Sequence, residues 1–527
     1  MIKQLPSIFN DVIGPIMRGP SSSHTAAAVR IGRLIRQMIK GSIKEVLVEF
    51  EPKGALATTY HGQGSDMGFV GGLLGYELWD EQLNDSLKEA VERGILVQFR
   101  IADFEASHPN TYRITTLDNR NEQISIIAIS TGGGMIEVQM LDGLPVNIAG
   151  DNFETLLFFG NIHESLVKRH KVLIEKAISN IEYIDDSIEN DRGLIHIKTN
   201  IKLQEKDISK LYELSNISNI IQLTPVLPIQ STKNCVIPFS DSQEMLEIGI
   251  KQNLAPWELA VLYESARGSL SKEEVFEKMR DIVKLMCNSI EEGLRGTVYE
   301  DRILGPQAWR IAIAKKEGKL IPADVLNTIT SCITAIMEVK SSMGVIVAAP
   351  TAGSCGGVPG TIIGAAKEMC KSIEDITKAM LAAGIIGVFI AENSGFAAEV
   401  GGCQVECGAA SGMAAAGLAQ LVGGTVQQSI DAASMALQNV LGMVCDPVGG
   451  RVEVPCLGKN VMAGVNAVAC ANMILSGFDK VIPLDETLTA MDKVGQMLPS
   501  ELRCTGYGGL STTQTSKDIF NRLNRVD

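Results

Sequence analysis

Hydrophobic and polar positions follow different periods along the chain and divide it into three parts. In residues 1–150, apolar stretches with strand-like character at positions 46–52 and 96–103 are interspersed with helical patterns at positions 30–41 and 84–94. Strands that alternate with helices in this way predict an α/β domain.

Residues 151–228 contain a shorter and more regular succession of elements. The predicted order is strand, helix, strand, strand, helix, strand, at positions 155–160, 166–180, 181–188, 193–199, 205–216 and 220–226. A βαββαβ unit of this size is a ferredoxin-like module. In the order of its elements it resembles the ACT domain, a small regulatory unit that usually senses amino acids.

The rest of the chain is rich in alanine, glycine and methionine and has helical periodicity. The polar run QSTKN marks a linker at residues 229–242, and residues 243–527 read as a mostly α-helical catalytic domain. One helical face there carries regularly spaced apolar side chains, namely Val275, Met279, Ile282 and Met286. The many small residues predict closely packed helices. We therefore expect a multidomain protein.

The charge of the chain narrows the choice of partners. The formal net charge is −14 at pH 7 and the pI is about 5.1. Nucleic acids and anionic membranes attract clustered lysine and arginine, so we expect the chain to bind neither. The longest apolar stretch, residues 379–391, is shorter than the roughly 18 residues of a membrane-spanning helix. A small-molecule partner is the better expectation.

The first residues, MIKQLPSIFNDVIG, lack the charged head, apolar run and cleavage site of a signal peptide. We therefore expect a cytoplasmic protein. Because the cytosol keeps thiols reduced, the eleven cysteines are expected to be buried side chains, metal ligands or reactive thiols and not a disulfide framework.

The motif GPSSSHTAAAVRIGR places three serines just before an alanine-rich helical stretch. The hydroxyls of Ser21, Ser22, Ser23 and Thr25, with free backbone N–H groups, are able to bind a carboxylate or simply to cap the helix. The spacing alone leaves these two roles equally open. His24 favours the first, because an imidazole beside anion-binding donors can transfer protons near neutral pH.

Two further motifs of the N-terminal part place polar residues on loops. HGQGSD contains His61, Gln63 and Asp66, although such glycine spacing is common in ordinary turns. SHPNT contains His108, which before a proline is more often a structural residue than a functional one. We keep His61 and His108 beside His24 as candidate catalytic residues, and Gln63 and Asp66 as candidate substrate ligands.

In the helical part, APTAGSCGGVPG contains Thr351, Ser354 and Cys355 in a glycine-rich segment. Such a segment could hold an anion in a nest of backbone N–H groups or form a tight turn between helices. We take Thr351 and Ser354 as candidate carboxylate ligands. The spacing of Cys355 assigns it no role.

Three cysteines stand in GGCQVECG, VCDPVGG and VEVPC, where Cys403, Cys445 and Cys456 are separated by 42 and 11 positions. Three thiolates that leave one iron open would suit a catalytic iron–sulfur cluster, whose exposed iron acts as a Lewis acid on a substrate hydroxyl. The spacing is not a CxxC arrangement, and on spacing alone buried free cysteine is the more common explanation. Cys407 and Cys504 are assigned no role.

Taken together, the motifs resemble the iron–sulfur L-serine dehydratases, or L-serine ammonia-lyases. GPSSSHTAAAVRIGR, TYHGQGSD, HPNT and STGGG resemble the β subunit, and APTAGSCGGVPG, GGCQVECGAASGMAAAG, VCDPVGGRVEVPC and LRCTGYGGLSTT resemble the α subunit. In many relatives these are separate chains, whereas here they are fused with the ACT-like module between them. The resemblance covers nearly the whole chain.

This resemblance implies an activity, a cofactor and a set of ligands. The activity would be the conversion of L-serine to pyruvate and ammonia. For this reaction we expect the serine-rich motif and residues 351–354 to hold the substrate carboxylate. The cofactor would be a 4Fe–4S cluster held by Cys403, Cys445 and Cys456. We further expect a homodimer.

Gln63 leaves open which residue accepts the α-proton and which amino acid is the substrate. It stands where relatives have a histidine that is proposed to take the α-proton, and glutamine is no base at neutral pH. Either His24, His61 or His108 takes that proton, or the substrate is another amino acid such as threonine or cysteine. A non-catalytic sensor of amino acids or redox state, and a pyridoxal-phosphate lyase, also remain as alternatives.

Overall fold

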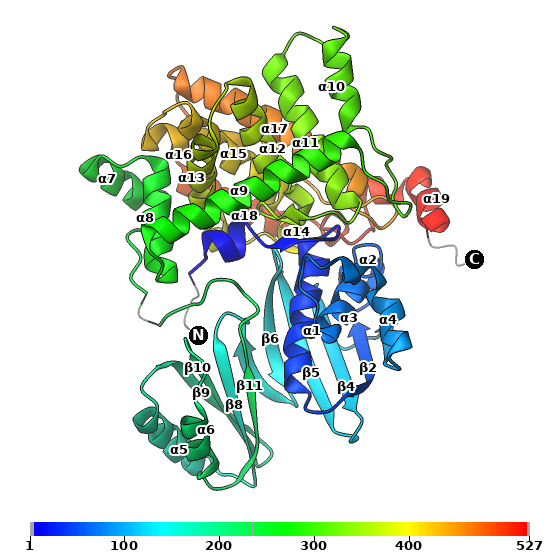
Figure 1. Cartoon of the computed structure of the whole chain (residues 1–527), viewed down its shortest axis with the longest axis vertical. Coiled ribbons are helices and arrows are strands. Elements are labelled where there is room, and N and C mark those ends of the chain that lie inside the picture. Colours follow the sequence, from blue (N-terminus) through cyan, green and yellow to red (C-terminus); the bar gives the residue numbers. More distant parts are fainter. Residues whose placement is uncertain (1–4, 234, 524–527) are drawn as a thin grey trace.

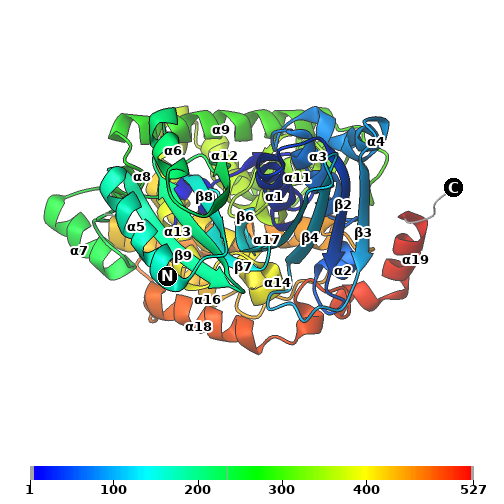
Figure 2. The same ribbon diagram turned by 90° about the horizontal axis from the view of Figure 1, so that it is seen from below.

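A computed structural model of the chain describes residues 5–233 and 235–523. Figure 1 shows three regions: an α/β region, a smaller α/β module beside it, and a helical region above both. Seen from below, the two sheets lie side by side beneath the helical region (Figure 2). Within the described ranges, no helix is long and apolar enough to cross a membrane.

The α/β region is built on a six-stranded sheet in the order β3-β2-β4-β5-β6-β7. Its strands are β2 (Ile43–Phe50), β3 (Leu96–Ile101), β4 (Thr111–Asp118), β5 (Gln123–Gly132), β6 (Met135–Leu141) and β7 (Leu144–Ile148). Its helices are α1 (Ala27–Met38), α2 (Leu56–Thr59), α3 (Ser65–Leu74), η3 (Glu81–Asp85) and α4 (Ser86–Glu92). Only β2 and β3 pair in parallel, and the other neighbours are antiparallel. The predicted α/β character of this region is confirmed.

Glycines let α1 and α3 approach each other closely. A Cβ atom on Gly72 would lie 2.1 Å from Val29 O, and one on Gly68 would lie 2.5 Å from Thr25 O. Because glycine has no Cβ, the two backbones can touch at these points. The serine-rich motif before α1 is thereby brought next to the HGQGSD loop before α3.

The middle module has the element order predicted from the sequence. It consists of β8 (Phe153–Gly160), α5 (Glu164–Ala177), β9 (Ile181–Glu189), β10 (Arg192–Thr199), α6 (Glu205–Tyr212) and β11 (Ile217–Leu223). The four strands form an antiparallel sheet in the order β11-β8-β10-β9. The module has a small apolar core of its own, to which Leu157, Val167 and Ile195 contribute.

The C-terminal region is mostly helical, as predicted. Its long helices are α7 (Ser242–Gln252), α8 (Pro256–Gly268), α9 (Lys272–Arg295), α10 (Ala308–Lys316), α11 (Asp324–Ser341), α12 (Gly357–Glu368), α13 (Ile373–Asn393), α15 (Cys407–Leu421), α16 (Val426–Gln438), α17 (Glu453–Leu475), α18 (Leu484–Met497) and α19 (Gln514–Leu523). Its short elements are β12 (Ile346–Val347), η4 (Ala352–Ser354), α14 (Ala398–Gly401), η5 (Cys403–Val405), η6 (Ser500–Leu502) and η7 (Gly509–Thr512).

The packing of these helices confirms two predictions. The predicted apolar face of α9 is buried, with Val275, Met279, Ile282 and Met286 in the core. Small residues do permit close contact, because a Cβ on Gly293 of α9 would lie only 2.2 Å from Ala335 O of α11.

The first described residues pack into the helical region before the chain enters the α/β region. η1 (Ile8–Val12) contributes to the core that the helices share. β1 (Ile16–Met17) then pairs antiparallel with β12. Because β1 precedes the serine-rich motif and β12 precedes the APTAGSC segment, this pairing places the two motifs next to each other.

Candidate active site

The serine-rich motif forms η2 (Ser22–Ala26), a π-helical turn that leads directly into α1. The Ser21 hydroxyl caps this turn by accepting a hydrogen bond from His24 N at 3.3 Å. Thr25 Oγ1 donates to Gln63 O at 2.8 Å and so holds the HGQGSD loop. Helix capping, one of the two roles that the sequence left open, is therefore present. It does not prevent the other hydroxyls of the motif from binding a carboxylate.

Two serines of this motif bridge to the helical region. Ser22 Oγ accepts a hydrogen bond from Ala352 N in η4 at 3.1 Å. Ser23 Oγ donates to Glu399 Oε1 in α14 at 2.8 Å. A hydrogen bond contributes about 0.5–1.5 kcal/mol net, or more when it involves a charge. The two bonds hold the α/β and helical regions in a fixed relation at this point.

His24 is fully buried, and its two ring nitrogens have different partners. Nε2 lies 2.8 Å from Thr59 Oγ1, and Thr59 donates its own hydroxyl hydrogen to Ala55 O at 2.6 Å. Thr59 can therefore only accept from His24, which assigns the imidazole hydrogen to Nε2 and leaves Nδ1 as an acceptor. Nδ1 lies 3.0 Å from Ser23 Oγ and 3.5 Å from Glu399 Oε1. Burial lowers the pKa of His24 against the opposing effect of Glu399, so the ring is neutral at pH 7.

The two other candidate histidines are held differently. His61 is largely exposed and its Nδ1 lies 2.6 Å from Asp66 Oδ2, a hydrogen bond that raises the pKa of His61. His108 Nδ1 accepts a hydrogen bond from Asn110 N at 3.1 Å, and burial lowers the pKa of His108, so its neutral ring carries the hydrogen on Nε2. Of the three histidines, His24 is the buried neutral ring whose acceptor nitrogen faces the junction of the two regions.

Gln63 lies at the same junction and faces the cysteines. Its side chain is buried, and Nε2 lies 3.7 Å from Cys504 Sγ, to which it donates. Next to this loop, a cavity of about 810 Å³ is lined by His61 and Gly62 on one side and by Arg451, Tyr507 and other C-terminal residues on the other. The cavity therefore lies beside the HGQGSD loop, and Thr59, the partner of His24, is among its lining residues.

Five buried cysteines gather in the helical region next to Gln63. They are Cys403 in η5, Cys407 and Cys456 in the first turns of α15 and α17, and Cys445 and Cys504 in loops. The thiols of Cys403, Cys407 and Cys456 hydrogen-bond one another, and the Cys445 thiol bonds that of Cys504. The charge of Cys403 also acts on Cys445, so the three predicted ligands belong to one group, together with two thiols to which the sequence assigned no role.

The surroundings of these thiols suit a negatively charged group. Lys340 Nζ is fully buried and has no hydrogen-bond partner in the described part of the chain. Hydrogen bonds from the Cys403 and Cys407 thiols, and then the charges of Lys340 and Lys459, lower the pKa of Cys456. A buried ammonium without a partner is costly unless an anion lies near it. Thiolates bound to an iron–sulfur cluster would supply that anion, so the donor set fits such a group.

A single metal ion is a different case. Among residues 5–233 and 235–523, no three His, Cys, Asp or Glu side chains are placed to hold one ion. In an iron–sulfur cluster the thiolates bind to different iron atoms, so they do not have to converge on one point. The cysteines are therefore candidates for a cluster and not for a mononuclear site.

Two buried carboxyl groups beside the cysteines were missed by the sequence reasoning. Glu399 precedes Cys403 in α14, and Glu406 precedes Cys407 at the start of α15. Burial, and then the Cys456 charge, raise the pKa of Glu406 to about 8, so this group is protonated at pH 7. The available signal was two acidic residues in an otherwise uncharged run, AEVGGCQVECGAA, because charged residues are rarely buried without a partner or a function.

Thr351 and Ser354 are engaged with each other in η4. Thr351 N donates to Ser354 Oγ at 3.1 Å, and Ser354 N donates to Thr351 Oγ1 at 3.3 Å. The adjacent Cys355 is fully buried, and burial raises its pKa to about 12. The turn is thus held by its own hydroxyls, and its place beside Ser22 keeps it at the candidate site.

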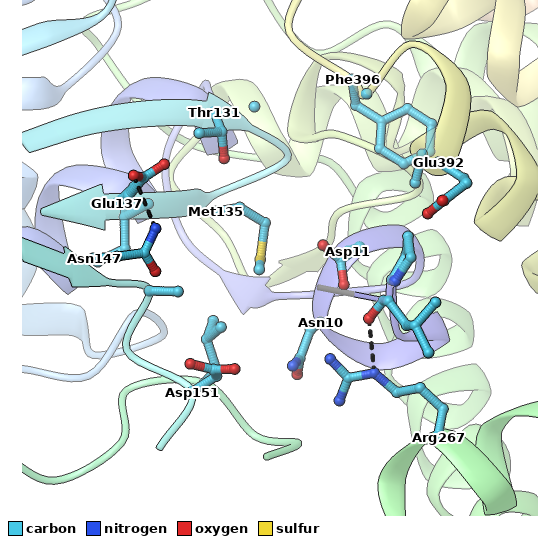
Figure 3. Close-up of a pocket in the computed structure, with 18 residues that line it drawn as sticks. Asn10, Asp11, Thr131, Met135, Glu137, Asn147, Asp151, Arg267, Glu392 and Phe396 are labelled. Carbon is cyan, nitrogen blue, oxygen red and sulfur yellow. Dashed lines mark hydrogen bonds between the residues drawn. The ribbon is translucent and has the colours of Figure 1, made fainter. Parts of the chain in front are cut away.

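A separate cavity of about 280 Å³ lies where the α/β region, the segment around Asp151 and the helical region meet (Figure 3). The carboxyl groups of Asp11, Glu137, Asp151 and Glu392 and the guanidinium of Arg267 line it. None of the residues predicted from the sequence lines this cavity. The predicted site residues gather instead at the junction of η2, η4, α14 and the cysteines.

Comparison with known proteins identifies relatives of both parts of the chain. Residues 203–511 match the family described as serine dehydratase alpha chain. The chain is 36% identical over 285 residues to the probable L-serine dehydratase alpha chain of Bacillus subtilis, covering 54% of this chain and 95% of that protein. It is also 36% identical over 220 residues to the probable L-serine dehydratase beta chain of Bacillus subtilis, covering 42% of this chain and 97% of that protein.

A relative with both parts in one chain is similar over almost the full length. The L-serine dehydratase of Helicobacter pylori is 26% identical over 502 residues, covering 94% of this chain and 96% of that protein. The alpha-chain match extends over more than half of the sequence, and a beta-chain relative is matched as well. The chain therefore belongs to the serine dehydratase alpha chain family, with a part similar to the beta chain fused to it.

Proposed function

We propose that this chain is an L-serine dehydratase, which converts L-serine to pyruvate and ammonia at the junction of its α/β and helical regions. The names of its relatives point to the substrate. The observation that carries the proposal is the meeting of His24 and Ser23 from one region with Glu399 from the other, beside the buried cysteines. This junction combines a buried neutral base, hydroxyl groups and thiols.

Cys403, Cys445 and Cys456 are proposed to hold a 4Fe–4S cluster, as the resemblance implies. When bound, such a cluster supplies a Lewis-acidic iron that makes a substrate hydroxyl a better leaving group. The buried ammonium of Lys340 and the neighbouring Lys459 support this assignment, because they offset the charge of thiolates. Cys407 and Cys504 are not assigned as ligands.

The substrate carboxylate is proposed to bind at η2 and η4. η2 and α1 together form one continuous helical segment, which Ser21 caps and whose first turn contains Ser22 and Ser23. Free N–H groups at such a helix start favour an anion. The turn that contains Thr351 and Ser354 lies against Ser22 and adds donors from the helical region.

His24 is proposed to accept the α-proton at Nδ1. The Nε2 hydrogen is held by Thr59, and Nδ1 is the nitrogen that faces the junction. The Ser21 hydroxyl lies 3.2 Å from Nδ1 and can pass a proton to it. Loss of the α-proton and of hydroxide gives an enamine, which tautomerises and hydrolyses to pyruvate and ammonia. Gln63, which cannot serve as a base, instead donates to Cys504.

We also propose that the middle module is ACT-like and that the protein acts as a cytoplasmic homodimer. The strand order β11-β8-β10-β9 with two helices supports the first of these assignments. Equilibrium dialysis of the full chain against amino acids, and sedimentation analysis, would test the module and the dimer respectively.

A substrate panel tests the proposed activity. The full chain, loaded with iron and sulfide without oxygen, should release a 2-oxo acid and ammonia from L-serine with a higher kcat/KM than from L-threonine or L-cysteine. Turnover of L-threonine or L-cysteine with negligible turnover of L-serine would contradict the choice of substrate. An activity that depends on pyridoxal phosphate would contradict the choice of cofactor.

A further inference from the structure

One carboxylate oxygen of Glu399 has no hydrogen-bond partner within residues 5–233 and 235–523. Oε1 accepts from Ser23 Oγ at 2.8 Å and lies 3.5 Å from His24 Nδ1, whereas Oε2 has no donor. The residue is only 5% exposed. Burying a carboxylate oxygen without a hydrogen-bond donor costs free energy. An unpaired buried oxygen such as Glu399 Oε2 therefore indicates that a bound ligand supplies the donor.

We propose that Glu399 binds the α-ammonium group of the amino-acid substrate through Oε2. The inference rests on the proposed function and adds to it the residue that recognises an amino acid as distinct from a hydroxy acid. An ammonium group offers three donors and a full positive charge, which together would satisfy Oε2.

The other carboxyl groups near the site are already occupied. Asp66 bonds His61 at 2.6 Å, Asp446 bonds Lys459 at 2.7 Å, and Glu453 accepts from the backbone N–H groups of Ile303 and Leu304. Glu406, whose pKa is raised to about 8, carries no charge at pH 7. Among the described residues, the nearest basic side chain to the Glu399 carboxylate is His24, whose ring is neutral. Of these carboxyl groups at the site, Glu399 is the one with an unpaired buried oxygen.

The position of Glu399 also suits the reaction. The ammonium group and the hydrogen to be removed are bonded to the same carbon atom of the substrate. A residue that binds the ammonium must then lie next to the residue that accepts the proton, and Glu399 Oε1 is 3.5 Å from His24 Nδ1. The charge of Glu399 also acts on His108, Tyr112 and Cys504, which places it centrally in the junction.

Two small acids that cannot be dehydrated test this role without relying on turnover. L-Alanine has the ammonium and carboxylate groups of serine but no hydroxyl, and propanoate has the carboxylate alone. Calorimetry on the iron-loaded full chain should show tighter binding of L-alanine than of propanoate. In Glu399→Gln this preference should fall about tenfold or more, because the charge-assisted hydrogen bond to the ammonium group is lost.

Two further variants separate recognition from folding. Glu399→Asp retains the charge and should keep part of the preference. Glu453→Gln removes a buried carboxylate whose two oxygens already have partners, and should leave the preference unchanged. The inference is overturned if the unaltered chain binds both acids equally, or if Glu399→Gln weakens both by the same factor. Preserved preference with no serine turnover would contradict the proposed function and not this inference.

Discussion

Ser23 Oγ donates a hydrogen bond to Glu399 Oε1 at 2.8 Å, and the two residues are 376 positions apart in the sequence. The bond joins the α/β region, which is similar to a separate beta chain in some relatives, to the helical region. It fixes the carboxylate next to His24 Nδ1. The candidate site therefore depends on both regions, and neither contains it alone.

Replacing Ser23 with alanine should weaken this junction. Loss of one buried bond to a charged acceptor is expected to lower the free energy of unfolding by about 1.5–3 kcal/mol. We expect kcat/KM for L-serine to fall about tenfold, since 1.4 kcal/mol of lost positioning corresponds to that factor. Urea unfolding and a pyruvate assay measure the two effects. Ser209→Ala, which removes an exposed hydroxyl bonded within α6, should change neither. An unaltered kcat/KM in Ser23→Ala would contradict the account.

His24 and His108 should differ strongly when replaced by glutamine. His24→Gln removes the acceptor nitrogen and is expected to lower kcat by about 10²–10⁴-fold, the usual contribution of a general base. In His108→Gln, the decrease should be much smaller, because His108 Nδ1 is occupied by Asn110 N. Steady-state kinetics with L-serine give both values. A larger loss in His108→Gln than in His24→Gln would show that the proton acceptor is misassigned.

The pH dependence follows from the burial of His24. Burial lowers the pKa of His24 below 6.5, so the neutral form that accepts a proton persists below that pH. The acidic limb of kcat/KM should therefore lie below pH 6.5. If His61 were the base, the limb would lie above 6.5, because its hydrogen bond to Asp66 raises its pKa. Rates measured from about pH 5 to 8 distinguish the two, since the profile of kcat/KM reports the free enzyme.

The same shift has a consequence for stability. Between the lowered pKa of folded His24 and 6.5, the unfolded chain binds a proton that the folded chain does not. This residue therefore makes the folded state less stable as the pH falls below 6.5. His24→Gln should make unfolding in urea less dependent on pH in that window, and an unchanged dependence would contradict the assignment of a buried neutral ring.

Single replacement of cysteines by serine tests the ligand set. Iron content after anaerobic loading should fall sharply for the proposed ligands, Cys403, Cys445 and Cys456. Cys407→Ser and Cys504→Ser should retain iron, and Cys370→Ser, at an exposed position, serves as the control. Equal loss of iron in Cys407→Ser or Cys504→Ser would show that the neighbouring thiols take part in binding.

Gly402 fixes the backbone that leads into Cys403. Its φ of +73° is unfavourable for other residues, and a Cβ would lie 2.7 Å from Met443 O. Gly402→Ala should therefore displace Cys403, lower iron content and reduce stability. Gly458→Ala, two positions after Cys456 in α17, has nothing within 4 Å of the added Cβ. That control should gain about 0.5–1 kcal/mol, because alanine favours a helix over glycine. Normal iron content in Gly402→Ala would contradict the predicted displacement.

Much of the architecture could be predicted from local patterns. Within short segments, the period of hydrophobic and polar positions is enough to predict several features. These are the α/β character of the first part, the order of elements in the middle module and the buried face of α9. The pairing of β1 with β12 could not be found in this way, because two residues on each side give no periodic signal. It nevertheless places the serine-rich motif beside η4.

The candidate site was predictable in its motifs and not in its contacts. The motifs around His24 and Cys403 were found because unusual residue types stand close together in sequence. Thr59 and Glu399 were missed, since their roles arise from contacts with His24 and Ser23 that only the folded chain makes. Which nitrogen of His24 is the acceptor depends on the hydrogen that Thr59 donates to Ala55 O, and no sequence pattern specifies that.

The central claim is that this chain eliminates water and ammonia from L-serine at the junction of its two regions. The most direct measurement is the release of pyruvate and ammonia from L-serine by the full chain loaded with iron and sulfide without oxygen. The account predicts equal amounts of both products, and loss of both in His24→Gln while iron content is retained. An iron-loaded chain that binds L-serine but releases neither product would contradict the account and favour a sensor.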